Sequence, residues 1–377
     1  MRLAIISLPL HVNYGGILQS YALKKELESM GHEVVVIDRK VKMPFPKWWK
    51  APLIYMNRAL KSLKGGSDAP EVFREYRCMK EYPVLSRELK PFVDAEIAPL
   101  KIDSYKDIKK GDFDGFIVGS DQVWRPRYFG KIEDAFLDFA RGWEVKRVSY
   151  AASFGTDDLE FGSESLRICA GLLKEFDAVS VRECSAVKIC DEWLDYDGAV
   201  HVLDPVMLID VVDYQRIAQR AECRRAKGKI MTYMLDPSTN KAAVTDLVKA
   251  WTGKDAEEFS VNPHDRKVPL EQRVVPPVEN WLAGFADADF IVTDSFHATV
   301  LALIFHKPFI TVGNGKRGMS RLSSLLEMFG LDQRLVHGID PEDDGEYFLS
   351  QPDWEAVDSV LDEKRKLSRS FLADALK

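Results

Sequence analysis

The chain has 377 residues, of which 46% are hydrophobic and 29% are charged, as expected for a soluble globular protein large enough to form two domains. Its net charge of −7 argues against a nucleic-acid partner, which usually requires a basic face, but allows a small anionic ligand. The five cysteines include no C-x-x-C pair, which argues against a disulfide framework or a zinc ribbon and favours a reducing cytoplasm.

The N-terminal residues briefly imitate a signal peptide, with Met1-Arg2 before an apolar run. That run is short and leads into polar residues and a glycine pair, so we predict a first β-strand instead. No apolar run approaches the length needed to cross a bilayer, and any membrane association is therefore expected to be peripheral.

The first forty residues predict a βαβ unit, with strands at Leu3–Ser7 and Val34–Ile37 and a helix at Ile17–Met30. The loop before the helix lacks the G-x-G-x-x-G pattern of a dinucleotide site. Its glycines would let a ligand approach the helix N-terminus, or they form a turn with a structural Asn; the two interpretations are about even. The loop residues concerned are Asn13, Tyr14, Gly15 and Gly16.

Residues 41–110 differ in composition and predict a helical excursion from the first domain, with helices at Leu53–Lys64 and Val72–Tyr82. Such an excursion could form a flap over a cleft. Trp48 and Trp49 lie among lysines and could stack on a sugar or touch a membrane surface. Packing of these aromatic rings onto the body of the protein is the simpler expectation.

Three further buried strands are predicted, each ending in small or polar residues. They are Phe116–Val118 before Asp121, Val148–Ala151 before Ser153, and Ala178–Val181 before Arg182 and Glu183. Ligands of open α/β sheets bind at the carboxyl ends of strands, so these ends are expected to line one side of a crevice. The alternative is that the polar residues are ordinary turn residues, caps or surface ion pairs.

An Asp-Pro pair at residues 204–205 is a suitable place for the chain to leave the first domain. We therefore predict an N-terminal domain at residues 1–207, a C-terminal domain at 208–345 and a helical region at 346–377 that packs back across both. Elements expected in the second part are strands at Ile230–Leu235, near Glu258–Val261, at Phe290–Val292 and at Phe309–Val312, and helices at Lys241–Trp251, Ala298–Phe305, Leu322–Phe329 and within Trp354–Leu376.

The turn from Thr293 to His297 joins a buried strand to an apolar helix. Asp294 or Ser295 can cap this helix, so that its first N–H groups and positive dipole end face a ligand above the strand. His297 then lies in the first turn, beside that anion site. Taken alone, D-S-x-H is more often a plain helix cap than a functional site.

A basic, glycine-rich loop follows the strand at Phe309–Val312 and includes Lys316 and Arg317, with Arg321 at the next helix start. Cations beside a helix N-terminus suit a carboxylate or a phosphate. A solvated surface loop is an equally good interpretation.

Six motifs occur in order along the chain: NYGGILQSYAL at 13–23, GSDQVW at 119–124, SYAASFG at 149–155, SVRE at 180–183, LDP at 203–205 and TDSFHATV at 293–300. Together they resemble the polysaccharide pyruvyl transferase family, and the resemblance spans Asn13 to about Arg334. The resemblance implies two Rossmann-like domains facing across a cleft, as in the glycosyltransferase B architecture. It also implies transfer of pyruvate from phosphoenolpyruvate to a saccharide, without a metal or other cofactor, which leaves a ketal on two sugar hydroxyls.

The resemblance carries the donor-binding arginine of the family onto Arg182 and its histidine onto His297. Two positions depart from the usual pattern: Ala298 replaces a glycine and Val206 replaces a threonine. Ala298 could crowd a phosphate that approaches the helix start.

The chemistry that the resemblance implies needs a proton donor and acceptor near neutral pH, which suits His297, with Asp294 orienting its ring or deprotonating the acceptor. Arg182 suits the donor carboxylate, because its planar fork can bind both oxygens. Other donor contacts are expected from Ser295, Arg317 and Arg321, and acceptor contacts from Asn13, Tyr14, Gly15 and Asp121.

Two other functions are compatible with the sequence, since one fold supports many activities. A nucleotide-sugar-dependent glycosyltransferase would bind a nucleoside diphosphate, and a non-catalytic saccharide-binding protein would release no phosphate. The sequence does not say which sugar is the acceptor or whether it is carried on a lipid, a polymer or a nucleotide. We expect a cytoplasmic protein, with work at the inner face of the membrane left open.

Overall fold

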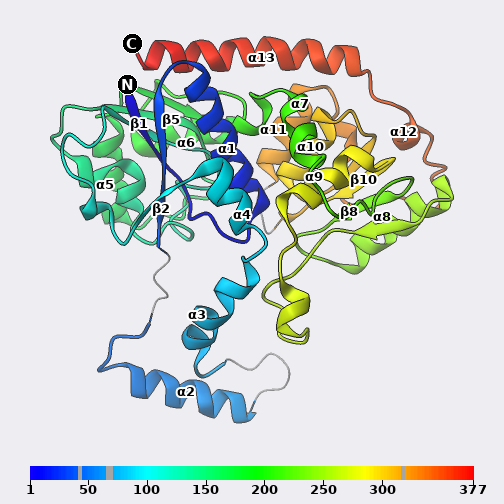
Figure 1. The fold of residues 1–377 in the computed structure, drawn as a ribbon, viewed down its shortest axis with the longest axis horizontal. Helices are drawn as coiled ribbons and strands as arrows, with labels where there is room; N and C mark the ends of the chain where they lie inside the picture. The colour runs from blue at the N-terminus through cyan, green and yellow to red at the C-terminus, as the bar shows by residue number, and fades with distance from the viewer. Residues whose placement is uncertain (41–44, 65–70, 316–318) are drawn as a thin grey trace.

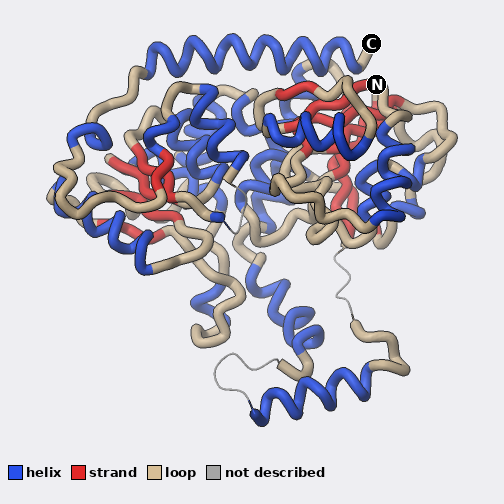
Figure 2. Tube along the Cα trace, turned by 180° about the vertical axis from the view of Figure 1, so that it is seen from behind, coloured by secondary structure: helices blue, strands red, loops and turns tan. Residues whose placement is uncertain are grey.

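The computed structural model describes residues 1–40, 45–64, 71–315 and 319–377. It contains two parallel β-sheets that lie side by side, each flanked by helices (Figure 1, Figure 2). The fold is therefore α/β with two Rossmann-like domains. Within the described ranges, no helix is both long and apolar enough to cross a bilayer.

The N-terminal sheet has seven strands in the order β3-β2-β1-β4-β5-β6-β7, and all neighbouring pairs are parallel. This order reverses direction between β1 and β4, where a doubly wound sheet opens a crevice at its carboxyl edge. The strands are β1 (Arg2–Ile6), β2 (Glu33–Arg39), β3 (Leu100–Ile102), β4 (Gly115–Val118), β5 (Lys146–Ala152), β6 (Ala178–Val181) and β7 (Val200–His201).

The C-terminal sheet has five parallel strands in the order β12-β11-β10-β8-β9, and its switch point lies between β8 and β10. Helix α10 follows β10 at this point, as the sequence predicts. The strands are β8 (Ile230–Tyr233), β9 (Ala256–Glu258), β10 (Phe290–Thr293), β11 (Phe309–Val312) and β12 (Leu335–Val336).

The helices agree with the predicted ones in position to within a few residues, but the sequence analysis missed α4 to α7, α9 and the short α12. It also missed the edge strands β3, β7 and β12. The helices are α1 (Tyr14–Ser29), α2 (Ala51–Lys64), α3 (Arg74–Leu85), α4 (Lys90–Phe92), α5 (Ser163–Leu173), α6 (Cys184–Leu194), α7 (Val211–Ala218), α8 (Thr239–Thr252), α9 (Val278–Asp287), α10 (Phe296–Ile304), α11 (Ser320–Met328), α12 (Glu346–Leu349) and α13 (Trp354–Ala375).

The excursion between β2 and β3 is helical, and α2 and α3 project from the body on the side opposite α13 (Figure 1). The base of α3 is attached to the C-terminal domain. Buried Arg273 is 3.0 Å from the Glu81 carboxylate, and the Val275 N–H donates to the Leu85 carbonyl at 3.0 Å. The excursion therefore bridges the two domains at its base while its tip extends into solvent.

Helix α1 joins the two domains through an aromatic stack. The Tyr14 ring lies 4.5 Å from that of Trp281 on α9 and almost parallel to it, and the Tyr14 hydroxyl donates to the Pro276 carbonyl at 2.8 Å. One continuous group of buried apolar side chains runs from α1 through the Asp-Pro linker to α9 and α10. The domain interface thus has the apolar character of a core.

Helix α13 packs back across both domains, as Figure 1 shows. Its first part stacks Trp354 on His306 of the C-terminal domain. Further along, the Arg369 guanidinium donates to both Glu26 carboxylate oxygens on α1 at 2.7 and 3.1 Å. The helix therefore ties the domains together on the side away from the cleft.

The apolar face of α13 provides a test of this role. Leu372→Ala removes a fully buried side chain and should lower the free energy of unfolding by about 2–5 kcal/mol. Leu367→Ala on the same helix is the control, because Leu367 is 56% exposed and its truncation should change stability by less than about 0.5 kcal/mol. Urea unfolding measures both; equal losses would contradict the packing described.

Candidate active site

A cleft of about 440 Å³ lies between the two domains, at the switch points of both sheets. Residues that follow β1 and β4 face those that follow β8 and β10 across it. Its lining includes Asn13, Gly15, Asp121 and Gln122 from the N-terminal domain and Tyr233, Leu235, Asp294, Ser295, Phe296, His297, Asn314 and Arg321 from the C-terminal domain.

His297 occupies the first turn of α10, where the predicted helix start is confirmed. Ser295 is the N-cap, and its hydroxyl accepts from the Ala298 N–H at 3.5 Å. His297 is only 7% exposed, and its imidazole reaches across the cleft to the N-terminus of α1. The first turns of two helices from different domains therefore meet at this ring.

Gly15 makes this approach possible. A Cβ atom at residue 15 would lie 2.0 Å from Nδ1 of His297, far inside van der Waals contact. Gly16 is different, because the nearest atom to a Cβ there is Nδ2 of Asn13 at 3.4 Å. The glycine pair thus has one position that the imidazole requires and one that it does not.

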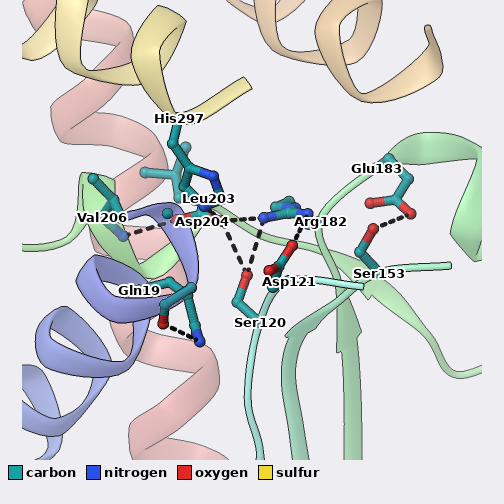
Figure 3. A network of polar contacts seen from close by, with 12 residues as sticks. Gln19, Ser120, Asp121, Ser153, Arg182, Glu183, Leu203, Asp204, Val206 and His297 are labelled. Atoms are coloured by element: carbon teal, nitrogen blue, oxygen red, sulfur yellow. Dashed lines mark hydrogen bonds and ion pairs between the residues drawn. The ribbon is translucent and has the colours of Figure 1, made fainter. Parts of the chain in front are cut away.

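Asp204 lies beneath His297 and organises the floor of the cleft (Figure 3). One carboxylate oxygen accepts from Nη1 of Arg182 at 2.7 Å and from the Ser120 hydroxyl at 2.9 Å, and it is 3.7 Å from Nε2 of His297. The other oxygen accepts from the Val206 N–H at 3.0 Å. Sequence reasoning treated this Asp-Pro pair only as a domain boundary, although its place in the LDP motif was a usable signal.

Arg182 is buried at the end of β6, below the cleft. Its Nη1 binds Asp204, and its Nη2 is 3.6 Å from the carboxylate of Asp121, which is an ion-pair distance but not a hydrogen bond. Among the described residues, neither Nε nor Nη2 has a hydrogen-bond acceptor. This edge of the guanidinium is the pair of N–H groups that a carboxylate can bridge.

Two buried guanidinium groups lie near the Phe296 ring. The Arg182 guanidinium carbon lies 4.5 Å from the ring centre and that of Arg321 lies 5.9 Å from it. Burial, reinforced by the charge of Arg182, lowers the pKa of Arg321 to about 10. The group still carries a full positive charge at neutral pH, and an anion in the cleft would relieve part of its desolvation cost.

The protonation of His297 is set by the same environment. Burial is the largest effect and lowers the pKa of the imidazole; the Asp204 carboxylate opposes this shift, while Arg182 adds to it. The resting form at neutral pH is therefore the neutral ring. Its Nε2 has no hydrogen-bond partner within the described part of the chain.

Asp294 does not orient His297, contrary to the sequence-based expectation. Its carboxylate accepts from the Leu235 N–H at 2.6 Å, from Nζ of Lys241 at 2.6 Å and from Nδ2 of Asn314 at 2.9 Å. Because those donors follow β8 and β11, Asp294 fixes the loops beside the cleft. Asp204, brought close by the domain interface, is the carboxylate next to the imidazole.

The remaining predicted residues divide into two groups. Asn13, Gly15, Asp121, Ser295 and Arg321 all line the cleft. The Asn13 side chain caps α1 through the Gly15 N–H at 3.1 Å and donates to Asp121 at 3.3 Å.

Two predicted contacts stand apart from this group. Tyr14 is buried with its hydroxyl and ring engaged at the domain interface, so its observed role is packing, and acceptor contact is not what this geometry supports. Arg317 lies outside the described residues. Within the described ranges, no group of three or more His, Cys, Asp or Glu side chains is arranged to hold a metal ion.

The fold and the cleft define a two-domain α/β protein of the glycosyltransferase B architecture, with a polar site between the domains. Comparison with known families is more specific. The family model described as polysaccharide pyruvyl transferase matches residues 13–316, and the chain belongs to that family. A comparison with curated proteins yields no significant match.

Several solved structures resemble the whole chain at low identity. A UDP-GlcNAc 2-epimerase from Neisseria meningitidis bound to UDP-GlcNAc is 11% identical, with 99% of this chain and 100% of that one covered and a TM-score of 0.49. One from Methanocaldococcus jannaschii, in complex with UDP-GlcNAc and UDP, is 13% identical over 97% and 94%, with a TM-score of 0.48.

The two glycines of α1 form a matched pair for mutagenesis. Gly15→Ala should displace the His297 imidazole and lower the free energy of unfolding by about 1–3 kcal/mol, the usual cost of overpacking. Gly16→Ala, in the same turn, should be neutral or stabilising because alanine favours the helix. Thermal melts compare the two; equal effects would show that the imidazole does not rest against Gly15.

The pH dependence of stability tests the buried neutral imidazole. The folded-state pKa of His297 lies below the unfolded value of about 6.5, so below that pH the unfolded state binds the extra proton and stability falls as pH falls. His297 can change the free energy of unfolding by at most about 1.4 kcal/mol per pH unit, and this pH dependence vanishes above the unfolded-state pKa of about 6.5. His297→Gln should therefore reduce the slope measured by urea unfolding between neutral and mildly acidic pH.

A second histidine gives a positive comparison for this experiment. His11 is half-buried, and loss of solvation, with the nearby His264, lowers its pKa to about 4. His11→Gln should flatten the profile by a similar amount. A His297→Gln profile that coincides with the parent would show that the ring titrates normally.

Proposed function

We propose that the protein transfers the pyruvyl group of phosphoenolpyruvate to a saccharide, forming a ketal on two sugar hydroxyls. Membership of the family supports a transferase. The observation that carries the proposal is the open edge of buried Arg182, whose Nε and Nη2 donors lack acceptors among the described residues. Buried donors without partners cost free energy, so a bound anion is the expected complement.

The overall reaction consumes one enol double bond and two hydroxyl groups. The methylene carbon gains a proton and becomes a methyl group, both sugar oxygens bond to the neighbouring carbon, and the carbon–oxygen bond to phosphate breaks. The two hydroxyl protons end on the methyl group and on the departing phosphate. One group that accepts and then releases protons can serve both transfers.

His297 suits this task because its resting form is neutral and can accept a hydroxyl proton. The imidazolium that results would be stabilised by the carboxylate of Asp204, 3.7 Å from Nε2. Asp204 cannot easily be protonated itself: burial would raise its pKa, but Arg182 and His297 outweigh burial and hold it below the ordinary value. We assign Asp204, in place of Asp294, to positioning and charge stabilisation.

The donor has a carboxylate and a phosphate, and two buried guanidiniums, those of Arg182 and Arg321, lie near the Phe296 ring. We assign the open edge of Arg182 to the carboxylate and Arg321, with Ser295 and the start of α10, to the phosphate. The charge on phosphate grows as its bond breaks, so fixed cations stabilise the transition state. Asn13, Gly15 and Asp121 on the opposite wall would then face the acceptor.

The reaction needs no cofactor beyond the donor itself in this scheme. We place it in the cytoplasm; the five cysteines, all of which are free thiols, fit a reducing compartment. A lipid-linked sugar is one candidate for the saccharide acceptor.

The test is phosphate release from phosphoenolpyruvate with a panel of saccharide acceptors, together with thermal melts. Phosphoenolpyruvate at a hundred times its dissociation constant should stabilise the protein by about 2.7 kcal/mol. Arg321→Gln should weaken this effect. Arg182→Ala is unsuitable, because it would leave Asp204 charged and buried without a partner.

His297→Gln should lower phosphate release by about 10²–10⁴-fold while the melt still responds to the donor. His306→Gln is the matched control: this histidine sits after the opposite end of α10 and pairs with Asp358 at the surface. Stabilisation by nucleotide sugars alone would contradict the proposal in favour of a glycosyltransferase. Saccharide binding without any phosphate release would favour a binding protein.

A further inference from the structure

The outer face of α2 exposes a ridge of large apolar side chains. Leu53, Met56, Leu60 and Leu63 follow one another at spacings of three, four and three residues, which aligns them along one side of the helix. Leu63 is 85% exposed and Leu60 is 52% exposed. Isolated exposed leucines are ordinary, but a contiguous apolar row on a projecting helix marks an interaction surface.

The turn before α2 extends this surface with two indole rings. Trp48 is 81% exposed, and it meets Trp49 edge to face at 5.8 Å. Nζ of Lys47 lies 5.3 Å above the Trp49 ring. The expectation that these aromatic rings pack onto the body is therefore wrong.

The charge of this segment is opposite to that of the whole chain. Residues 45–64 contain five Lys or Arg and no Asp or Glu, whereas the chain as a whole carries −7. Lys47, Lys50 and Lys61 are exposed. An apolar ridge flanked by tryptophans and lysines has the composition of a helix that lies in the interface of an anionic membrane.

The opposite face of α2 is held in place, so the ridge points outward in a fixed direction. Arg58 binds the Glu75 carboxylate of α3 through two hydrogen bonds of 2.8 and 2.9 Å, and the Tyr55 ring lies 5.1 Å from that of Phe73. Figure 1 and Figure 2 show α2 at the tip of the projection, clear of both domains. A flat surface can therefore reach the ridge without meeting the body.

We propose that the surface formed by Trp48, Trp49 and the α2 ridge binds peripherally to membranes that contain anionic lipids. Charge distinguishes a membrane from a second copy of this chain as the binding partner. A second copy would bring an equally basic segment to the ridge, whereas a layer of anionic lipid headgroups attracts the basic segment. The acidic body is then repelled from the lipid, which leaves the projection as the point of contact.

The position of the projection relates this surface to the cleft. Tyr82 on α3 packs edge to face against His11 at 5.5 Å, and His11 lines the cleft. Helix α3 would thus connect the cleft to the proposed membrane-binding surface. Both lie on the side of the molecule at which the carboxyl ends of the strands open. This part of the inference rests on the proposed function, and it identifies the acceptor as a saccharide carried on a membrane lipid.

The first experiment is co-sedimentation of the full chain with vesicles of mixed phosphatidylglycerol and phosphatidylcholine. The parent should bind these vesicles, bind pure phosphatidylcholine weakly and lose binding at high salt. The double variant Leu60→Ser, Leu63→Ser should bind about a hundredfold more weakly, since each leucine loses its apolar contact. Lys50→Gln should weaken binding about fivefold.

Leu367→Ser is the matched control, because this leucine is also exposed but lies on α13 at the other side of the molecule. Its binding should equal that of the parent. Absence of sedimentation with anionic vesicles, or equal binding by the double variant, would overturn the proposal. Sedimentation velocity that shows a dimer lost in the double variant would overturn it in favour of a second copy.

The double variant also separates this inference from the proposed function. Residues 60 and 63 lie far from the cleft residues in the fold, so the donor-induced thermal shift should persist in it. In the parent protein, a normal donor-induced shift together with absent binding to anionic vesicles would refute the membrane-binding surface and leave the proposed function standing.

Discussion

The buried ion pair between Arg182 and Asp204 is the interaction on which the site depends. It joins the end of β6 to the linker between the domains, and through Ser120 it includes the end of β4. Both charges are desolvated, so either one alone would cost several kcal/mol. The pair also creates the surroundings of His297, because the ring that descends from the other domain meets a carboxylate already held in place.

Topology explains why these groups meet at one point. Each sheet reverses strand order once, between β1 and β4 in the first sheet and between β8 and β10 in the second. At each reversal the loops that follow the two strands run in opposite directions, which opens a crevice at the carboxyl edge of the sheet. The apolar interface around Tyr14 and Trp281 sets the two switch points face to face. A polar cleft therefore forms between domains that share one hydrophobic core. Helix α13 lies across both domains on the side opposite α2 and α3 and holds them in this arrangement.

In the excursion after β2, apolar residues are exposed to solvent, whereas in the two sheets they are buried. In the sheets, runs such as Val34–Ile37 are largely buried and stabilise the fold, whereas the leucines of α2 are left in solvent. The helix period is visible in both the sequence and the structure, but the period alone does not say which face is covered. Only the placement of α3 against one side of α2 shows that the other side is open.

The sequence by itself determined the eight central strands, the helices that follow the conspicuous loops, and the family, because alternating or continuous apolar runs and ordered motifs are local properties. It also indicated His297, Arg182 and the glycine pair. The tertiary structure alone decided that Asp204 and not Asp294 lies beside the imidazole, that Tyr14 packs between domains, and that Gly15 makes room for the ring. These are contacts between residues more than 80 positions apart. No local pattern in the sequence encodes whether the folded chain brings Asp204 or Asp294 to the ring of His297.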